Sequence, residues 1–398
     1  MKSYGLVLAG GGAKGAYQIG AWKALRELHI EIEAITGVSI GAINGALIAE
    51  GDYEKALELW TNVEVKSGIN LPGELKAPDN LFSVLNMPQI FSEMLRNGGV
   101  DVTPARELIS CYVHEDKVRA AQIPLGIVTF QLSGFKPVEL YLDEIPEGEL
   151  IDYLMLSARF PGLHNDSPDG ERYLDGGIYD NAPVDLLRKR GYNRCIVVDI
   201  SGMKGVAHRA DFSNGEFVYI RPNDPKALGE SFEFDKSMVE MRMQMGYLDT
   251  MKAFGRYKGR LYYFRPKEFA RLQEHYGYAA VAELEELAEE LELPRLIVYT
   301  EQQFMRKLLK LGKQKKDVLE RVGLTQTLLR VAQPLLEKAP EDLLQKLKKT
   351  PKKAPKKTKA PKPPRYPKAN EALKQYAAEE QKRKEERKQK RAAEAAEC

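Results

Sequence analysis

The residues with the clearest chemical potential form a G-x-S-x-G pattern, Gly37-Val38-Ser39-Ile40-Gly41. The pattern lies between a β-branched run and a helix-forming segment, so Ser39 is expected in a strained turn with positive φ that exposes its hydroxyl. Gly37 and Gly41 leave room for neighbouring backbone, and the N-terminus of the following helix favours a developing oxyanion. The pattern indicates a nucleophilic serine. The alternative is a turn in which Ser39 only caps the helix.

A second glycine-rich turn lies upstream, and its sequence is Gly10-Gly11-Gly12-Ala13-Lys14-Gly15. Successive N–H groups in such a turn can point into one concavity and hold an anion. As G-x-G-x-x-G it could bind a dinucleotide, but the next strand runs into Ser39 rather than ending in an acidic residue for the ribose. We interpret the turn as an oxyanion hole with the Gly11 and Gly12 amides as donors and Lys14 adding positive potential. A glycine turn without a ligand remains the alternative.

A nucleophilic serine needs a general base. Of the five histidines, only His164 lies in a segment of interest, and Asp175 is the stronger candidate. Gly176 and Gly177 follow Asp175, so the chain can turn sharply there and leave the carboxylate accessible to a serine from another strand. Asp-Gly is also common in ordinary β-turns, so this segment taken alone does not decide between a base and a turn.

Taken together and in this order, the three segments resemble the motifs of the patatin-like phospholipase family: a glycine-rich oxyanion loop, a nucleophile elbow and a DGG motif. Residues 157–162 resemble a fourth family feature, a small-residue and proline segment before the DGG motif. The resemblance covers residues 4–200. It implies a three-layer α/β sheet domain and a catalytic dyad of Ser39 and Asp175, with Asp175 as the direct general base and with no metal or organic cofactor.

The resemblance also implies a function, namely hydrolysis of lipid esters by a serine acyl hydrolase of the phospholipase A or lysophospholipase kind. Two alternatives stay open. One is a soluble carboxylesterase or thioesterase that acts on small acyl esters, and the other is a catalytically silent lipid-binding scaffold. A lipid or phospholipid substrate is the expected partner. Nucleic acid is not expected, because no aromatic platform or binding motif accompanies the basic residues.

The elements that must position these residues follow from hydrophobic patterning. Strands are expected at residues 6–9, 33–36, 123–132, 138–142 and 194–200, and helices at residues 16–28, 40–50 and 183–190. Because strands alternate with helices, we expect parallel pairing in an α/β catalytic domain over residues 1–225. Residues 71–99 are rich in proline, asparagine and glycine, which predicts a lid-like loop.

Residues 226–350 have a helical pattern. We expect helices at residues 235–254, 268–291 and 300–310, and a strand at residues 260–265. The first helix holds five of the eleven methionines, which favours packing against the catalytic layer, with an acyl-chain groove as the alternative. Residues 304–316 are basic and amphipathic, so they fit either a packed surface helix or one lying on an anionic bilayer.

Charge divides the chain unevenly. Residues 351–398 hold 16 Lys and Arg residues against 7 Asp and Glu, a net charge of +9, whereas the whole chain carries +3. Residues 351–368 are Lys/Pro-rich and extended, and a very polar helical stretch without an apolar stripe follows to residue 396. We expect this disordered or helical basic tail not to fold alone, with contact to anionic lipid as an alternative role. The three cysteines do not form a disulfide framework. We expect no signal peptide or transmembrane helix, and therefore a cytoplasmic protein that is at most peripheral on a membrane.

Overall fold

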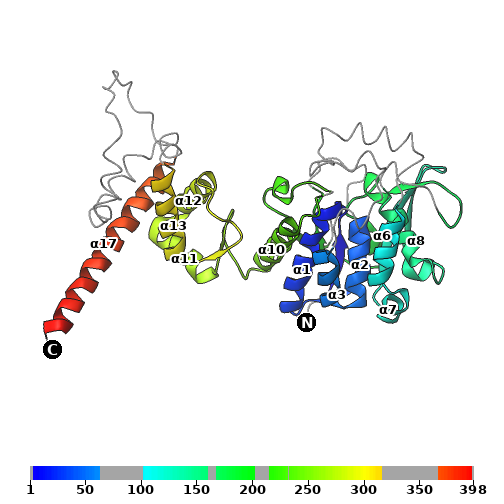
Figure 1. Cartoon of the computed structure of the whole chain (residues 1–398), viewed down its shortest axis with the longest axis horizontal. Coiled ribbons are helices and arrows are strands. Elements are labelled where there is room, and N and C mark those ends of the chain that lie inside the picture. The colour runs from blue at the N-terminus through cyan, green and yellow to red at the C-terminus, as the bar shows by residue number, and fades with distance from the viewer. Residues whose placement is uncertain are drawn as a thin grey trace, which may run out of the picture. The chain divides into compact units, whose positions relative to one another are not determined.

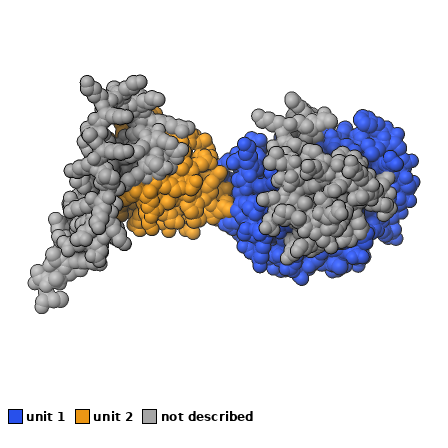
Figure 2. All heavy atoms as spheres, turned by 45° about the horizontal axis from the view of Figure 1, so that its top comes forward, with its two compact units in different colours: residues 1–254 blue, residues 255–398 orange. Residues whose placement is uncertain are grey.

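The computed structural model describes residues 3–62, 102–159, 167–201, 215–231, 233–315 and 366–396. The chain divides into two compact units, Met1–Phe254 and Gly255–Cys398 (Figure 2). The expected lid-like loop at residues 71–99 lies outside the described residues. The motifs that could do chemistry all belong to the first unit.

The first unit is built on a seven-stranded mixed sheet. Its strands are β1 (Ser3–Leu8), β2 (Glu31–Val38), β3 (Leu125–Gln131), β4 (Lys136–Tyr141), β5 (Tyr173–Asp175), β6 (Arg194–Val198) and β7 (Glu216–Ile220). The order across the sheet is β4-β3-β2-β1-β6-β7, and β5 pairs with β3. Five neighbouring strands are parallel to one another, namely β3, β2, β1, β6 and β7. β4 and β5 run antiparallel to β3. The α/β class is confirmed, but the pairing is not purely parallel.

Strand β3 has two partners on one of its edges. β4 pairs with β3 from Gly126 to Gln131 and so occupies the other edge. β2 ends where Val38 pairs with Val128, and β5 ends where Asp175 pairs with Thr129, the next residue along β3. The ends of β2 and β5 therefore meet head to head against the same strand.

Helices cover both faces of the sheet, which gives three layers (Figure 1). On one face, Ile35 and Leu8 lie against Gly45 of α2, and on the other Thr36 donates its hydroxyl to the Pro183 carbonyl just before α9, at 2.9 Å. The helices of this unit are α1 (Ala16–Glu27), α2 (Ile40–Glu50), α3 (Tyr53–Asn62), α6 (Thr103–Tyr112), α7 (Glu115–Ala120), α8 (Leu150–Ser157), α9 (Val184–Lys189) and α10 (Lys236–Ala253). Short 3-10 turns lie at Gly12–Gly15, Leu142–Glu144, Gly176–Ile178 and Pro225–Leu228.

Helix α10 belongs to the first unit because it packs directly on α1. A Cβ at Gly20 of α1 would lie 1.8 Å from the Met243 carbonyl oxygen, and one at Gly246 of α10 would lie 1.9 Å from that of Tyr17. The two backbones can approach this closely only through glycine. The first unit consequently extends past residue 225, where the sequence suggested a boundary. The methionine-rich helix is a packed one, with Met245 and Met251 buried.

The expected helices at the start of the chain are confirmed, including the end of α2 at Gly51, which has a φ of 84°. Strands β5 and β7 were not anticipated. β5 has only three residues and leads into the Asp-Gly-Gly turn, and β7 has five. Such short runs give too little alternation to be recognised from sequence.

The second unit is mainly helical. Its elements are β8 (Tyr263–Phe264), α11 (Pro266–Tyr276), α12 (Tyr278–Glu290), β9 (Val298–Tyr299), α13 (Glu301–Gln314) and α17 (Pro367–Ala396). The single helix expected at residues 268–291 is wrong, because Gly277, with a φ of 82°, separates α11 from α12. The capping box at the start of α13 is present, with the Thr300 hydroxyl accepting from the Gln303 amide at 3.2 Å. The apolar face of α13 is buried within this unit.

The helix expected up to residue 396 is confirmed as α17, but the expected absence of an apolar stripe is wrong. Residues 366–396 are described, and the beginning of α17 contributes side chains to the core of the second unit. These buried side chains are Tyr366, Ala369, Ala372, Leu373 and Tyr376. Their spacing of three or four residues is the helical stripe that the surrounding lysines and prolines obscure. Among the described residues, no helix is both long enough and apolar enough to cross a membrane.

A truncation tests whether the tail completes this core. Ending the chain after residue 365 removes two buried tyrosines and a buried leucine, a loss of roughly 5 kcal/mol or more. We expect the helical far-UV signal of the second unit to melt at a much lower temperature or to be lost. Both tryptophans, Trp22 and Trp60, lie in the first unit, so the fluorescence transition should stay unchanged.

The matched control ends the chain after residue 380, which keeps all five buried side chains. This variant should melt like the full chain. Equal melting of the two truncations would contradict a structural role for the beginning of α17.

Candidate active site

Ser39 lies at the junction of β2 and α2 with a φ of 55° and a ψ of −129°, the strained conformation that the sequence predicts. Close packing explains the flanking glycines. A Cβ at Gly37 would lie 2.4 Å from the Gly41 carbonyl oxygen, and one at Gly41 would lie 2.2 Å from that of Leu8. The Ser39 side chain makes no capping hydrogen bond to α2. The interpretation of Ser39 as a helix cap alone is therefore wrong.

Asp175, the last residue of β5, lies next to the Ser39 side chain. Its carboxylate accepts from the Gly177 amide at 2.8 Å, which fixes the turn behind it. The half-buried position raises the pKa of the carboxyl group by desolvation, while the hydrogen bonds from Ser39 and Gly177 lower it; the net pKa is raised. The Asp175 amide donates to the Arg159 carbonyl at 2.6 Å.

A buried serine links the elbow to β3. The Ser157 hydroxyl, at the end of α8, accepts from the Ser39 amide at 2.9 Å and donates to the Val128 carbonyl at 2.6 Å. A Cβ at Gly176 would lie only 2.3 Å from this same carbonyl oxygen. The elbow, the DGG turn and β3 thus meet around Val128, and Ser157 is a positioning residue that sequence reasoning recognised only as part of a small-residue segment.

The glycine-rich loop packs against the elbow. A Cβ at Gly10 would lie 3.1 Å from the Ser39 Cβ, and the Asn181 side-chain amide donates to the Gly10 carbonyl at 3.2 Å. Gly12 has a φ of 58°, and a Cβ there would lie 2.2 Å from the Ser231 carbonyl oxygen. Both properties restrict this position to glycine.

The loop leaves two backbone donors available. The Ala13 amide donates to the Ser231 carbonyl at 2.6 Å and the Lys14 amide to the Gly11 carbonyl at 3.3 Å. Within the described part of the chain, no acceptor is present for the amides of Gly11 and Gly12. Such free donors beside a serine are what an anion-binding turn requires.

Lys14 is half-buried beside this loop. Burial lowers the pKa of its ammonium group, the negative charge of Glu230 raises it and the Arg242 guanidinium lowers it, so that the net pKa is lowered. The side chain nevertheless adds positive charge next to the glycine turn. Gly15 ends the turn, where a Cβ would lie 2.6 Å from the Ile40 side chain.

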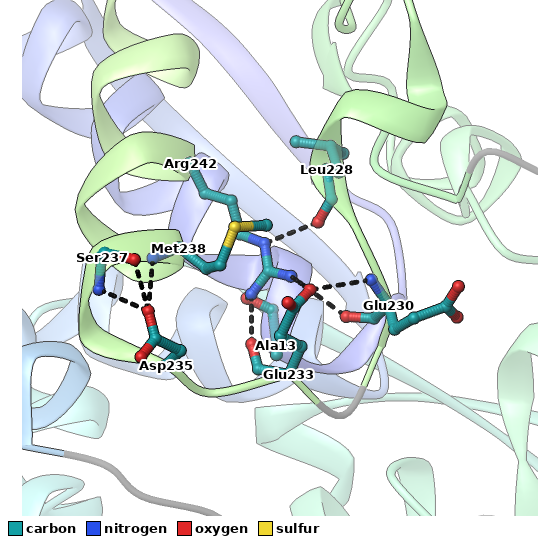
Figure 3. Close-up of polar contacts among 8 residues, drawn as sticks. All are labelled: Ala13, Leu228, Glu230, Glu233, Asp235, Ser237, Met238 and Arg242. Atoms are coloured by element: carbon teal, nitrogen blue, oxygen red, sulfur yellow. Dashed lines mark hydrogen bonds and ion pairs between the residues drawn. The ribbon is translucent and has the colours of Figure 1, made fainter. Parts of the chain in front are cut away.

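A fully buried arginine holds the loop from the side of α10 (Figure 3). Arg242 donates to the carbonyls of Leu228 at 2.7 Å, Ala13 at 3.3 Å, Glu233 at 2.5 Å and Glu230 at 3.1 Å, and pairs with the Glu233 carboxylate at 3.2 Å. Because a buried guanidinium needs several acceptors, these contacts tie residues 228–233 to the glycine-rich loop. Nothing in the sequence marks this arginine apart from its position among methionines.

A buried amide network holds the loop from the side of α1 and α2. Asn44 donates to the Gly15 carbonyl at 3.1 Å and to the Gln18 side chain at 2.8 Å, and accepts from the Trp60 indole at 3.0 Å. Gln18 in turn donates to the Ala9 carbonyl at 2.7 Å. Asn44 is the one amide in a helix of small and apolar residues, a signal that could have identified it as a positioning residue.

The histidines have other surroundings. His164 lies outside the described residues. His114 is hydrogen-bonded to Glu50 at 3.0 Å, and His275 to Glu301 at 2.7 Å in the second unit. In the described ranges, no group of three acidic, histidine or cysteine side chains could hold a metal ion.

Known proteins resemble this chain in sequence. Residues 6–188, from β1 to α9, match the family model described as patatin-like phospholipase. The chain is also 27% identical over 315 residues to lysophospholipase NTE1 of Kluyveromyces lactis, covering 74% of this chain and 20% of that protein. It is 26% identical over 274 residues to the human patatin-like phospholipase domain-containing protein 6, covering 66% and 18%. Residues 6–188 thus resemble the patatin-like phospholipase family, and the chain spans about a fifth of the length of these curated relatives.

A solved structure also shows similarity. The crystal structure of VipD from Legionella pneumophila aligns over 86% of each chain with 15% identity and a TM-score of 0.37. This score is too low to inform the geometry of the site.

Replacing Ser157 tests the junction around Val128. Ser157→Ala leaves the buried Ser39 amide and Val128 carbonyl without their partner, so we expect a loss of about 1–3 kcal/mol in unfolding free energy. The elbow should also shift, which lowers the rate at which a fluorophosphonate labels Ser39.

Thr36→Val is the matched control, because Thr36 is equally buried and donates its hydroxyl to a carbonyl, that of Pro183, outside the elbow. It should lower stability comparably and leave the labelling rate of folded protein unchanged. Equal labelling of the two variants would show that Ser157 acts only on stability.

Proposed function

We propose that this chain is a serine acyl hydrolase of lipid esters, of the phospholipase A or lysophospholipase kind. The observation that carries the proposal is the proximity of Ser39 and Asp175 at the junction of β2, β5 and β3. A serine hydroxyl next to a carboxylate supports a nucleophile and its general base. The family relationship, together with relatives named as lysophospholipase and patatin-like phospholipase, supports lipid esters as the substrate class.

In the first step, the Asp175 carboxylate takes the Ser39 hydroxyl proton as Oγ attacks the acyl carbonyl carbon. Negative charge develops on the carbonyl oxygen, and the amides of Gly11 and Gly12 serve as donors to it, with Lys14 and the N-terminus of α2 adding positive potential. The protonated Asp175 then gives its proton to the leaving alcohol. The product of this step is an acyl ester on Ser39.

In the second step, Asp175 takes a proton from water, whose oxygen attacks the acyl carbon. The same amides stabilise the second oxyanion, and its collapse releases the fatty acid while the proton returns to Ser39 Oγ. No step calls for a metal ion or an organic cofactor. A carboxylate with a raised pKa is a stronger base than an exposed one, which favours direct proton transfer from a serine.

Two other functions make different predictions. A soluble carboxylesterase or thioesterase would use the same dyad on small acyl esters and fail on vesicles. A catalytically silent lipid-binding scaffold would bind vesicles and react with no phosphonate. Fluorophosphonate labelling and vesicle turnover distinguish both functions from the proposed one.

Labelling and turnover test the proposal directly. The native chain should react with a fluorophosphonate probe and release fatty acid from mixed phospholipid vesicles. Ser39→Ala should lose the label, and Asp175→Asn should lower kcat by about 10²–10⁴-fold, the usual contribution of a general base.

The fold of each variant is checked by thermal melting. Ionised Asp175 is destabilised by burial, so the asparagine variant should be at least as stable as the native chain at neutral pH. An unlabelled native chain would refute the enzyme, and turnover of short nitrophenyl esters alone would refute the phospholipase. Normal turnover by Asp175→Asn would favour His164 as the general base.

The pH dependence follows from the raised pKa of Asp175. Only the ionised carboxylate can act as a base, so kcat/KM should fall as pH decreases, with its midpoint above the usual aspartate pKa of about 3.9. Because the Ser39 hydrogen bond lowers this pKa, Ser39→Ala should raise it further, which a ¹³C-NMR titration of the carboxyl group can measure. A midpoint at or below the usual value would contradict desolvation of this carboxylate.

For the tail, we propose contact with anionic lipid through the lysines between residues 351 and 365. Since residues 366–376 support the second unit, truncation would confound the test. Exchange of the six lysines for glutamine should instead weaken binding to phosphatidylglycerol vesicles at low salt, by up to about 1 kcal/mol for each charge, without changing the melting curve. Unchanged binding would reject this role. These residues are Lys352, Lys353, Lys356, Lys357, Lys359 and Lys362.

A further inference from the structure

The hairpin between β3 and β4 presents an aromatic side chain to solvent. Phe135 is 81% exposed and has a φ of 45°. A bulky residue in this region of backbone space is uncommon and strained. The fold therefore holds a large apolar side chain outward at a strained position, where a polar residue or glycine would be more stable.

Two further exposed apolar side chains belong to the same surface. Leu132 is 37% exposed, and its carbonyl accepts from the Phe135 amide at 3.2 Å. Ile178, in the turn after Asp175, is 45% exposed. The buried ring of Phe130 lies beneath them, with its centroid 5.2 Å from that of Phe135 and 6.5 Å from that of Tyr179, the neighbour of Ile178. The apolar surface thus runs from the hairpin to the DGG turn.

This surface lies at the edge of the sheet that carries the candidate active site. β2 and β3 are parallel, and Val38, the residue before Ser39, pairs with Val128. β3 continues for three residues to Gln131, so it ends roughly 10 Å beyond the level of Val38 at about 3.3 Å per residue. A surface that touched the hairpin would therefore meet the molecule on the side where Ser39 is presented.

Two cations flank the hairpin. Lys136 and Arg172 are exposed, and the Arg172 carbonyl accepts from the Leu132 amide at 2.7 Å. Nearby carboxylates have partners, since Glu139 pairs with Lys189 and Asp169 accepts from the Tyr173 hydroxyl. Glu171 is the remaining carboxylate next to Arg172. Exposed apolar side chains flanked by cations are the combination that binds an anionic lipid surface.

We propose that Leu132, Phe135 and Ile178, with Lys136 and Arg172, form a lipid-contact surface that binds the interface of an anionic phospholipid aggregate. Bound there, the first unit presents the Ser39 edge of its sheet to the lipid, so substrate reaches the dyad from the aggregate rather than from free solution. This inference rests on the proposed lipid-ester hydrolysis. It goes beyond that function by naming the surface through which the first unit binds the aggregate.

The experiment uses the full chain and vesicles of phosphatidylcholine with phosphatidylglycerol. We compare Phe135→Ser with Tyr278→Ser, a matched control because Tyr278 is 77% exposed in the second unit. Phe135→Ser should weaken vesicle binding by at least about tenfold, the loss expected for one interfacial aromatic side chain. The ratio of vesicle turnover to turnover of a monomeric nitrophenyl ester should fall equally, and Tyr278→Ser should change neither quantity.

The contribution of the cations is tested with two single variants, Lys136→Gln and Arg172→Gln. Each should weaken binding by about fivefold on vesicles with phosphatidylglycerol and have little effect on pure phosphatidylcholine. Repeating the series in the chain with the six tail lysines exchanged removes any contribution of the tail.

The outcomes separate this inference from the proposed function. Unchanged vesicle binding by Phe135→Ser, with normal hydrolysis, would overturn the lipid-contact surface and leave the hydrolase intact. Absence of hydrolysis by the native chain would refute the proposed function, while the binding comparison would still decide the surface. An equal loss in both turnover assays would show that Phe135 acts on the dyad and not on lipid contact.

Discussion

The first unit depends on one arrangement of backbone hydrogen bonds, the pairing of β2 and β5 with the same edge of β3. Val128 and Thr129 are neighbours in sequence and pair with Val38 and Asp175 respectively. Because the two strands run in opposite directions and meet at their ends, Ser39 and the Asp175 carboxylate lie next to each other. The relative position of these two residues is thus set by the register of the sheet. Ser157 secures the same point from α8.

The glycine-rich loop is positioned by a second means, buried polar side chains. Arg242 and the Ser231 carbonyl hold it from one side, and Asn44 and Gln18 from the other. Each of these buried groups is satisfied by carbonyls or amides, so none carries the desolvation penalty of an isolated polar group. The loop can therefore keep two amides without acceptors in the described part of the chain while its other groups are fixed. Rigid placement of such donors is what electrostatic stabilisation of an oxyanion requires.

Sequence reasoning reached the α/β fold, the family resemblance and the strained turn at Ser39 because those depend on local patterns. The turn at Ser39 demands glycine on either side, and such demands are visible in the chain itself. Contacts between distant segments are harder to recognise in the sequence. β5 is too short for a periodic pattern, Arg242 looks like any helix arginine, and the buried stripe from Tyr366 to Tyr376 is hidden among lysines. The sequence signal at Asn44 is of intermediate strength, since a lone amide in an apolar helix indicates a buried network without revealing its partners.

The length of β5 has a consequence for how the site would lose its geometry. β2 is held on both edges, by β1 and by β3, whereas β5 is held to β3 by three residue pairs. Local opening of a protein proceeds through its least connected segments, at a free energy below that of global unfolding. Local opening of β5 would therefore separate Asp175 from Ser39 before β2 leaves the sheet. The relative position of the two residues depends on the less connected of the two strands.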